Sequence, residues 1–126
     1  MKLPTVLIVD DAPSVRQLLQ TVFSRAGYAT VEAASGASAV RLASRHHPDL
    51  IVLDVELPIM NGFKVCERLK AASGVQDTKV LMLTARAADE DRDRAHELGA
   101  DAFVTKPFHP APLLELAARL LAPTPA

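Results

Sequence analysis

Residues 6–11 read VLIVDD, four apolar residues followed at once by two adjacent carboxylates, and this stretch decides the fold. Residues 50–56, LIVLDVE, repeat the combination, with Asp54 at the end of a second apolar run. Runs that are apolar at every position are typical of parallel strands covered on both faces. The acids that end them need water, a proton or a cation. The chain therefore combines buried strands with carboxylates at the strand ends.

Composition narrows the class of protein. The chain has 126 residues, the size of one domain with a single core, and 49% of them are hydrophobic, which excludes a disordered protein. Lys and Arg number 14 and Asp and Glu 15, and no basic cluster stands out. Binding to nucleic acid needs a concentrated positive patch, so we expect no direct nucleic-acid partner.

The single cysteine and the N-terminal residues indicate the cellular compartment of the protein. Cys66 has no second cysteine to pair with, so no internal disulfide can form, which fits a reducing environment. The first apolar run stops at Asp10, too early for a signal peptide or a membrane span. We expect a soluble cytoplasmic protein with no membrane insertion.

Segments of strand length alternate with segments of helical spacing five times. The expected strands are residues 5–9, 28–33, 50–53, 80–83 and 102–104. The expected helices lie around residues 15–23 and over residues 37–46, 63–72, 87–98 and 112–121, with Ser35 and Asn61 placed to cap the second and third. This alternation predicts an α/β fold, a doubly wound five-stranded parallel sheet with five helices on its two faces. We expect one domain over residues 1–122 and a Pro/Ala-rich tail over residues 123–126.

Five polar residues follow strands of this predicted sheet: Asp10, Asp11, Asp54, Thr84 and Lys106. In an open parallel sheet, ligands bind beyond the carboxyl ends of the strands, so these side chains should meet on one rim. Three carboxylates close together repel one another, and without a partner at least one would have a raised pKa. Mg²⁺ suits one or two carboxylates, waters and phosphate oxygens. With the charge of Lys106, it would neutralise the three acids and leave a site that accepts a phosphoryl group.

Each of these residues also has a plain structural interpretation. Asp11 could cap the first helix, Asp54 could open a turn before Pro58, and Thr84 could cap the fourth helix. Lys106 could be a solvated surface lysine. Taken singly, each plain interpretation is favoured, but their convergence on one rim favours a shared site.

The chain resembles the response-regulator receiver domains of two-component signalling, and chemotaxis regulators among them. The resemblance rests on VLIVDD at residues 6–11, LIVLDVELPIMNG at 50–62, LMLTA at 81–85 and FVTKPF at 103–108. It extends from Thr5 to about Leu121. It implies a flavodoxin-like three-layer sandwich with strand order 2-1-3-4-5.

The resemblance also implies roles at the rim. Asp54 would be the phosphoacceptor that attacks phosphorus and forms an acyl phosphate. Asp10, Asp11, a carboxylate oxygen of Asp54 and the backbone carbonyl of Glu56 would hold Mg²⁺ or Mn²⁺. Lys106 would pair with the phosphoryl oxygens. The chain would be a signalling domain that assists only its own phosphorylation and dephosphorylation, and not an enzyme in its own right.

Further residues match the switch of that family. Thr84 would move to hydrogen-bond the phosphoryl group, and Phe103 would change rotamer with it. The Lys106–Pro107 bond matches one that is cis in the family. Glu56 and Arg86, two positions beyond Asp54 and Thr84, would flank the entrance of the attacking water and set the lifetime of the phosphoryl group. They could pair across that entrance, or they could be two solvated side chains.

The implied partners are proteins. A sensor histidine kinase or phosphotransfer protein, or a small acyl phosphate, would donate the phosphoryl group. A downstream protein would bind the face formed by the fourth helix, the fifth strand and the fifth helix, and the chain would be a monomer or a weak phosphorylation-dependent dimer. Residues 87–98, AADEDRDRAHEL, carry few apolar side chains and should be loosely held, although an ordinary solvated helix would look the same.

Three other functions remain to be compared with a receiver that acts alone. The chain could be the receiver portion of a longer regulator with a DNA-binding or enzymatic output domain. A magnesium-dependent phosphohydrolase of the haloacid dehalogenase type would carry D-x-D after the first strand, where this chain has Asp10-Asp11-Ala12-Pro13. A flavin-binding domain would need a Ser/Thr/Gly-rich phosphate loop at the same place. The last two are therefore disfavoured.

Overall fold

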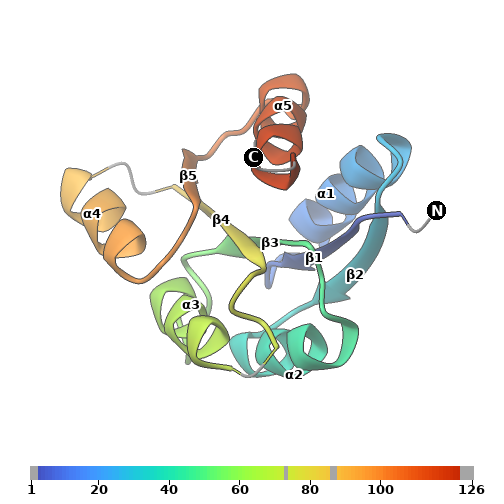
Figure 1. Cartoon of the computed structure of the whole chain (residues 1–126). Coiled ribbons are helices and arrows are strands. Elements are labelled where there is room, and N and C mark those ends of the chain that lie inside the picture. The colour runs from blue at the N-terminus through green and yellow to red at the C-terminus, as the bar shows by residue number, and fades with distance from the viewer. Residues whose placement is uncertain (1–2, 73, 86–87, 123–126) are drawn as a thin grey trace.

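The computed structural model describes residues 3–72, 74–85 and 88–122. Strands and helices alternate along the chain (Figure 1). The strands are β1 (Thr5–Val9), β2 (Ala29–Ala33), β3 (Leu50–Asp54), β4 (Lys79–Thr84) and β5 (Ala102–Thr105). The helices are α1 (Pro13–Arg25), α2 (Gly36–His46), α3 (Gly62–Ala71), α4 (Asp89–Glu97) and α5 (Pro110–Leu121). All strand pairs are parallel, in the order β2-β1-β3-β4-β5, so the expected doubly wound fold and strand order are confirmed.

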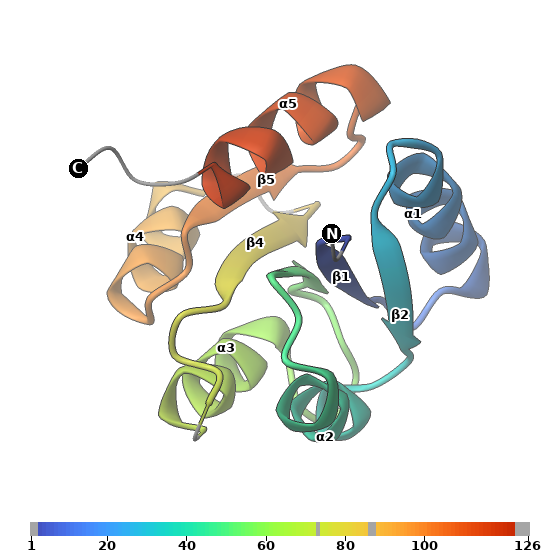
Figure 2. The ribbon, with the colours of Figure 1, turned by 45° about the vertical axis from the view of Figure 1, so that its right-hand side comes forward.

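The sheet is covered on both faces, and this explains why its central strands are apolar at every position. Helices α1 and α5 lie on one face and α2 and α3 on the other (Figures 1 and 2). Successive side chains of a strand point to opposite faces. In β1, Val6 and Ile8 therefore pack with Leu19 of α1, while Leu7 and Val9 pack in the other layer with α2 and α3. A strand with a core on each side tolerates no polar residue until it ends.

Local signals in the sequence account for the helix boundaries. The Ser35 side chain accepts a hydrogen bond from the Ser38 backbone N–H and caps α2, and the Asn61 side chain accepts one from Lys64 N at 3.1 Å and caps α3. Both caps confirm the predictions. Gly27, just beyond the end of α1, has φ 97°, a left-handed conformation that favours glycine.

Several predicted boundaries were wrong by one or two residues. The fifth helix was expected from about Pro112, with Pro110 and Pro112 at its start, and it begins at Pro110, where a proline fits because no N–H is needed. The fourth helix spans Asp89–Glu97, shorter than the predicted 87–98, since its polar sequence gives no apolar period to mark its ends. Strand β3 includes Asp54, which pairs with Leu83 of β4. The predicted tail, residues 123–126, lies outside the described residues.

Helix α4 is attached differently from the other helices. Of its residues only Asp91 and Ala95 are buried, and Asp91 was not expected to be. Two arginines of α4 stack on aromatic rings of neighbouring elements: Arg92 lies 5.0 Å from the ring centre of Phe103 in β5, and Arg94 lies 4.4 Å from that of Phe63 in α3. Such cation–π contacts contribute roughly 0.5–1 kcal/mol each where exposed. Weak cation–π contacts are therefore part of what holds this helix in place.

Within residues 3–72, 74–85 and 88–122, no helix is both long enough and apolar enough to cross a membrane.

Gly62 is the position at which α3 starts against the end of β3, and its replacement provides a test of this packing. A Cβ at Gly62 would lie 2.5 Å from the carbonyl oxygen of Asp54 and 2.6 Å from Cα of Val55. Because both are backbone atoms, Gly62→Ala should destabilise the protein by about 3 kcal/mol. Urea unfolding measures this loss.

Gly27→Ala is the matched control, because a Cβ there meets nothing within 4 Å and only the positive φ is strained. We expect it to cost about 1–2 kcal/mol. A Gly62→Ala protein that is as stable as Gly27→Ala would contradict the close packing of α3 on β3.

Candidate metal centre

The predicted site residues meet at the carboxyl edge of the sheet. Asp10 directly follows β1, Asp54 and Thr84 are the last residues of β3 and β4, and Lys106 follows β5. Asp10, Asp54 and Thr84 are buried, with 1%, 4% and 0% of their surfaces exposed. Parallel strands place their carboxyl ends on one rim, which is why residues far apart in the sequence converge here.

Three carboxylates form a cluster on this rim. Asp10, Asp11 and Asp54 each offer a ligand oxygen, and these oxygens lie within 4.8 Å of one another. Asp10 and Asp54 are buried, whereas Asp11 is exposed to solvent. Carboxylate oxygens are the ligands that a hard divalent cation prefers, and a half-open site suits Mg²⁺ because this ion keeps several waters. The donor set therefore fits the predicted magnesium ion.

The plain interpretation of Asp11 as a helix cap is wrong. Helix α1 starts at Pro13, and its N-cap position is Ala12, whose side chain makes no capping bond. Likewise Thr84 does not cap α4, whose N-cap position is Ala88.

Asp10 is held from several sides. Its Oδ1 accepts a hydrogen bond from Ala12 N at 2.9 Å, and its Oδ2 accepts one from Lys106 Nζ at 3.3 Å. Arg16 Nη1 donates to its backbone carbonyl at 2.8 Å, and Arg16 Nε lies 3.5 Å from Oε1 of Glu32 in β2. Both carboxylate oxygens of Asp10 thus already have protein partners, and the exposed Asp11 is the most open ligand of the three.

Arg16 was missed by sequence reasoning. Its position on α1, six residues after Asp10, gives no sign that its side chain folds back to the strand end. The contact with Asp10 depends on the rotamer of a long side chain, which no apolar period or spacing specifies.

Lys106 connects the two buried acids. Its Nζ lies 3.3 Å from Asp10 Oδ2 and 3.4 Å from Asp54 Oδ1. Burial alone would lower the pKa of Lys106, but the charges of Asp10 and Asp54 outweigh it and hold that pKa above its ordinary value. The lysine is therefore a fixed positive charge at the cluster and not a solvated surface residue. The Lys106–Pro107 peptide bond is cis, as the resemblance implied.

Asp54 is an acid of the cluster whose pKa is raised. Burial first, then the hydrogen bond with the Glu56 side chain and the charge of Asp10, raise its pKa from 3.8 to about 6, although Lys106 acts in the opposite direction. Its Oδ1 accepts a hydrogen bond from the backbone N–H of Glu56 at 3.1 Å. The expectation that at least one carboxylate would have a raised pKa is confirmed, and a divalent cation would restore the charged form.

Glu56 turns its carboxylate toward the end of β4. Its Oε1 accepts a hydrogen bond from the Thr84 hydroxyl at 2.5 Å and another from Ala85 N at 3.1 Å. Burial works against ionisation of Glu56, but these hydrogen bonds and the one shared with Asp54 together lower its pKa. The second half of the predicted gate, Arg86, lies outside the described residues, and so the Glu56–Arg86 pair stays a prediction. So does the backbone carbonyl of Glu56 as a metal ligand.

Phe103 lies beside the rim and not in it. Its ring is partly buried against the core layer that contains α3, and Arg92 covers the ring from α4. Arg92 Nη1 also donates to the Phe103 carbonyl oxygen at 3.4 Å. The predicted switch residue is therefore in direct contact with α4.

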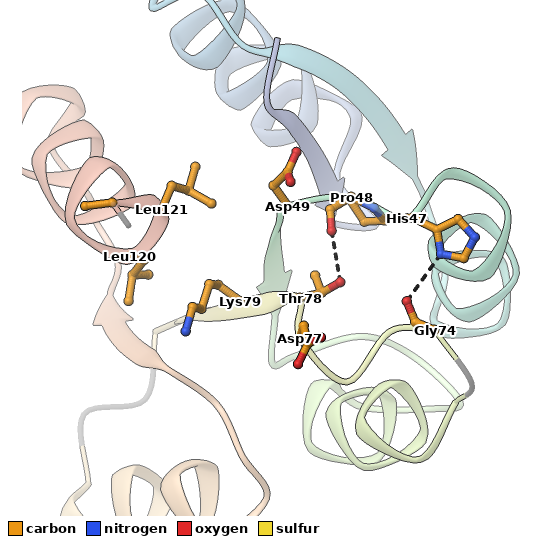
Figure 3. A pocket seen from close by; sticks show the side chains of 10 residues that line it. His47, Pro48, Asp49, Gly74, Asp77, Thr78, Lys79, Leu120 and Leu121 are labelled. Atoms are coloured by element: carbon orange, nitrogen blue, oxygen red, sulfur yellow. Dashed lines mark hydrogen bonds between the residues drawn. The ribbon is translucent and has the colours of Figure 1, made fainter. Parts of the chain in front are cut away.

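A cavity of about 410 Å³ lies at the opposite edge of the sheet (Figure 3). It is lined by residues before β3 and at the start of β4, including His47, Asp49 and Lys79, and by Leu121 at the end of α5. Thr78 Oγ1 donates to the Pro48 carbonyl oxygen at 2.9 Å and ties its walls together. This cavity contains none of the predicted site residues.

Replacement of Asp54 tests the electrostatics of the rim. In the absence of divalent cations, Asp54→Asn should stabilise the protein more at about pH 7.5 than at about pH 4.5. The folded-state pKa of about 6 exceeds the ordinary 3.8, so the folded protein binds this proton more tightly, and stability falls as the pH rises from about 4 through about 6. The shift corresponds to at most about 3 kcal/mol, and the lost ion pair with Lys106 reduces the gain.

Urea unfolding in EDTA at the two pH values measures this difference. Asp77→Asn, at an exposed position, is the control that removes an equal charge. An equal effect of Asp54→Asn at both pH values would show that the burial of this carboxylate does not penalise its charge.

A family model described as response regulator receiver domain matches residues 6–118. The chain is 40% identical to a probable transcriptional regulator, ycf27, of Porphyridium aerugineum, over 95% of this chain and 48% of that protein. It thus spans about half the length of the curated relatives it matches. One relative is named as a DNA-binding regulator, so the expectation of no nucleic-acid partner is not supported.

Solved structures give the same result. The chemotaxis protein CheY4 of Vibrio cholerae is 34% identical, with a TM-score of 0.91 over 95% of this chain and 100% of that one. The receiver domain of the sensor histidine kinase PA1611 of Pseudomonas aeruginosa, which holds a magnesium ion in its active-site cleft, is 28% identical, with a TM-score of 0.87 over 95% of this chain and 98% of that one. The chain belongs to the response regulator receiver domain family.

Proposed function

We propose that this domain accepts a phosphoryl group on Asp54 in a Mg²⁺-dependent reaction and that its phosphorylated form binds a partner protein. The observation that carries this proposal is the bridge of Lys106 between Asp10 and Asp54, with Asp11 completing the acidic cluster. A lone buried acid would be neutral, but here a fixed cation and a cation site surround a carboxylate that remains able to ionise.

The chemistry follows from these groups. An oxygen of ionised Asp54 attacks phosphorus, the new O–P bond forms an acyl phosphate, and the bond to the donor nitrogen or oxygen breaks with its electron pair on the donor. Phosphoryl transfer needs positioning and charge neutralisation more than covalent help. When bound, Mg²⁺ supplies two of the positive charges that balance the acids and the phosphoryl oxygens. Lys106 supplies the third, and Asp10 keeps Lys106 in place.

The response of the rest of the domain is also part of the proposal. Thr84 would bond the phosphoryl group, Phe103 would change its packing, and Lys106–Pro107 would set the direction of the chain after β5. Because Phe103 contacts Arg92, a change there reaches α4 directly. The downstream partner would bind the α4-β5-α5 face, and the domain would be a monomer or a weak phosphorylation-dependent dimer.

The proposed donor is a sensor histidine kinase or a phosphotransfer protein, and the domain would signal without turning over a substrate of its own. The curated relatives are about twice as long as this chain, and several are named as transcriptional regulators. These relatives are consistent with the alternative of a receiver within a longer regulator whose output acts on DNA. Location in the cytoplasm stays a prediction.

Phosphorylation can be tested without a partner. Incubated with acetyl phosphate and Mg²⁺, the wild-type domain should gain one phosphoryl group in its intact mass, because Asp54 is an acid of the cluster that pairs with Lys106 at 3.4 Å. Asp54→Asn should gain none, and EDTA should prevent the gain.

Asp77→Asn is the control for that experiment, since Asp77 is exposed and lines the cavity at the opposite edge. It should be phosphorylated like the wild type. Phosphorylation of the Asp54→Asn protein to the same extent would refute the assignment of the acceptor.

The gate is a separate proposal. If Glu56 and Arg86 shield the acyl phosphate from water, Arg86→Ala should speed its hydrolysis, by roughly fivefold if the pair is worth about 1 kcal/mol. The decay of the phosphorylated mass after removal of acetyl phosphate gives the rate. An unchanged rate would mean that the two residues do not form a gate.

A further inference from the structure

The Glu56 carboxylate occupies two hydrogen-bond donors beside the phosphoacceptor. Its Oε1 accepts from the hydroxyl of Thr84 and from the backbone N–H of Ala85, both at the carboxyl end of β4. Strand β4 lies next to β3 in the sheet, where Asp54 pairs with Leu83 and Val55 N donates to the Leu83 carbonyl oxygen at 3.1 Å. Thr84 is therefore one residue further toward the rim than the partner of Asp54, and Ala85 directly follows β4.

These donors form a small anion site. A hydroxyl and a backbone N–H that converge on one oxygen suit a charged acceptor, and such charge-assisted bonds are roughly twice as strong as neutral ones. The anion in this site is the Glu56 carboxylate, and the backbone of the same residue contacts the phosphoacceptor, because Glu56 N donates to Asp54 Oδ1 at 3.1 Å. One residue thus bonds Asp54 through its backbone and reaches the end of β4 through its side chain.

We propose that the Glu56 carboxylate is an internal stand-in for the phosphoryl oxygens. It holds the Thr84 hydroxyl and the Ala85 N–H in the unphosphorylated domain and leaves both when a phosphoryl group is attached to Asp54. The inference rests on the proposed function, and it concerns the resting state of the same site. No covalent bond changes in this exchange: the two donors pass from a carboxylate oxygen to phosphoryl oxygens, and the carboxylate turns to solvent.

The exchange fits the exposure of the residues. Glu56 is exposed as a residue, so its released carboxylate can be hydrated, whereas Thr84 is completely buried and needs an acceptor within the protein. The stand-in keeps that hydroxyl bonded in the absence of phosphate. It also makes each phosphorylation displace an existing anion, which lowers the affinity of the site for phosphoryl groups and their mimics.

A purely electrostatic role for Glu56 is the alternative. A second acid near Asp54 repels an anionic phosphoryl donor whichever way the Glu56 side chain points. The two explanations separate in a pair of variants. Glu56→Gln removes the charge but keeps an amide oxygen that can accept from Thr84 and Ala85. Glu56→Ala removes both the charge and the acceptor.

The affinity of the full chain for beryllofluoride in excess Mg²⁺, a non-covalent mimic of the phosphoryl group, distinguishes them. We expect Glu56→Ala to bind it about tenfold more tightly than the wild type, since one charge-assisted hydrogen bond contributes roughly that factor. Glu56→Gln should fall between the two. Glu115→Ala, which removes an exposed acid on α5, should bind like the wild type.

A second measurement tests the hydrogen bond from Ala85 N to the Glu56 carboxylate directly. In the Mg²⁺-bound protein without beryllofluoride, the amide proton resonance of Ala85 should move upfield in Glu56→Ala, because this N–H loses its hydrogen bond to a carboxylate. Equal tightening by Gln and Ala, or no tightening by Ala, overturns the stand-in while leaving phosphorylation of Asp54 intact. No binding by the wild type or by either Glu56 variant overturns the proposed function, and this inference with it.

Discussion

The burial of Asp54 at the end of an apolar strand is the constraint on which the rest of the site depends. Its carboxylate is 4% exposed, so water cannot solvate its charge, and its pKa rises to about 6. Two neighbours reduce that penalty, because Lys106 supplies a charge at 3.4 Å and the backbone of Glu56 donates a hydrogen bond. The charge of Asp10 adds to the penalty, and a cation bound by Asp10, Asp11 and Asp54 would offset it. The carboxylate is held rigidly because the strand that carries it has a packed layer on each face.

The same constraint explains which features could be predicted from the sequence. Buried parallel strands must be apolar until they end, so Asp10 and Asp54 mark strand ends by contrast with the residues before them. The convergence of the rim then follows from the fold. Boundaries in polar segments could not be predicted as well, since α4 has no apolar period, and the burial of Asp91 has no signal in a run of charged residues.

Side-chain contacts were the hardest to predict. Arg16 reaches back to the Asp10 carbonyl, and Glu56 reaches across to Thr84 and not only outward to solvent. Each depends on the rotamer of a long, charged side chain with several acceptors or donors within reach. The residue types and spacings alone do not decide between these choices. For this reason the sequence placed Glu56 near the entrance of the site but not on the donors of β4.

Helix α4 and the rim are connected by electrostatics more than by apolar packing. Arg92 contacts both the ring and the carbonyl oxygen of Phe103, and Arg94 stacks on Phe63 of α3, whereas the apolar residue that α4 buries is the small Ala95. A helix held by about 1 kcal/mol per contact shifts in response to small changes at its anchors. Such a change can occur at the rim, because two anions compete for the hydrogen-bond donors at the end of β4. They are the carboxylate of Glu56 and a phosphoryl group on Asp54. The same two donors, the Thr84 hydroxyl and the Ala85 N–H, then define both the resting and the phosphorylated state. The anion that they bind in each state fixes the position of Thr84, next to the strand that carries Phe103.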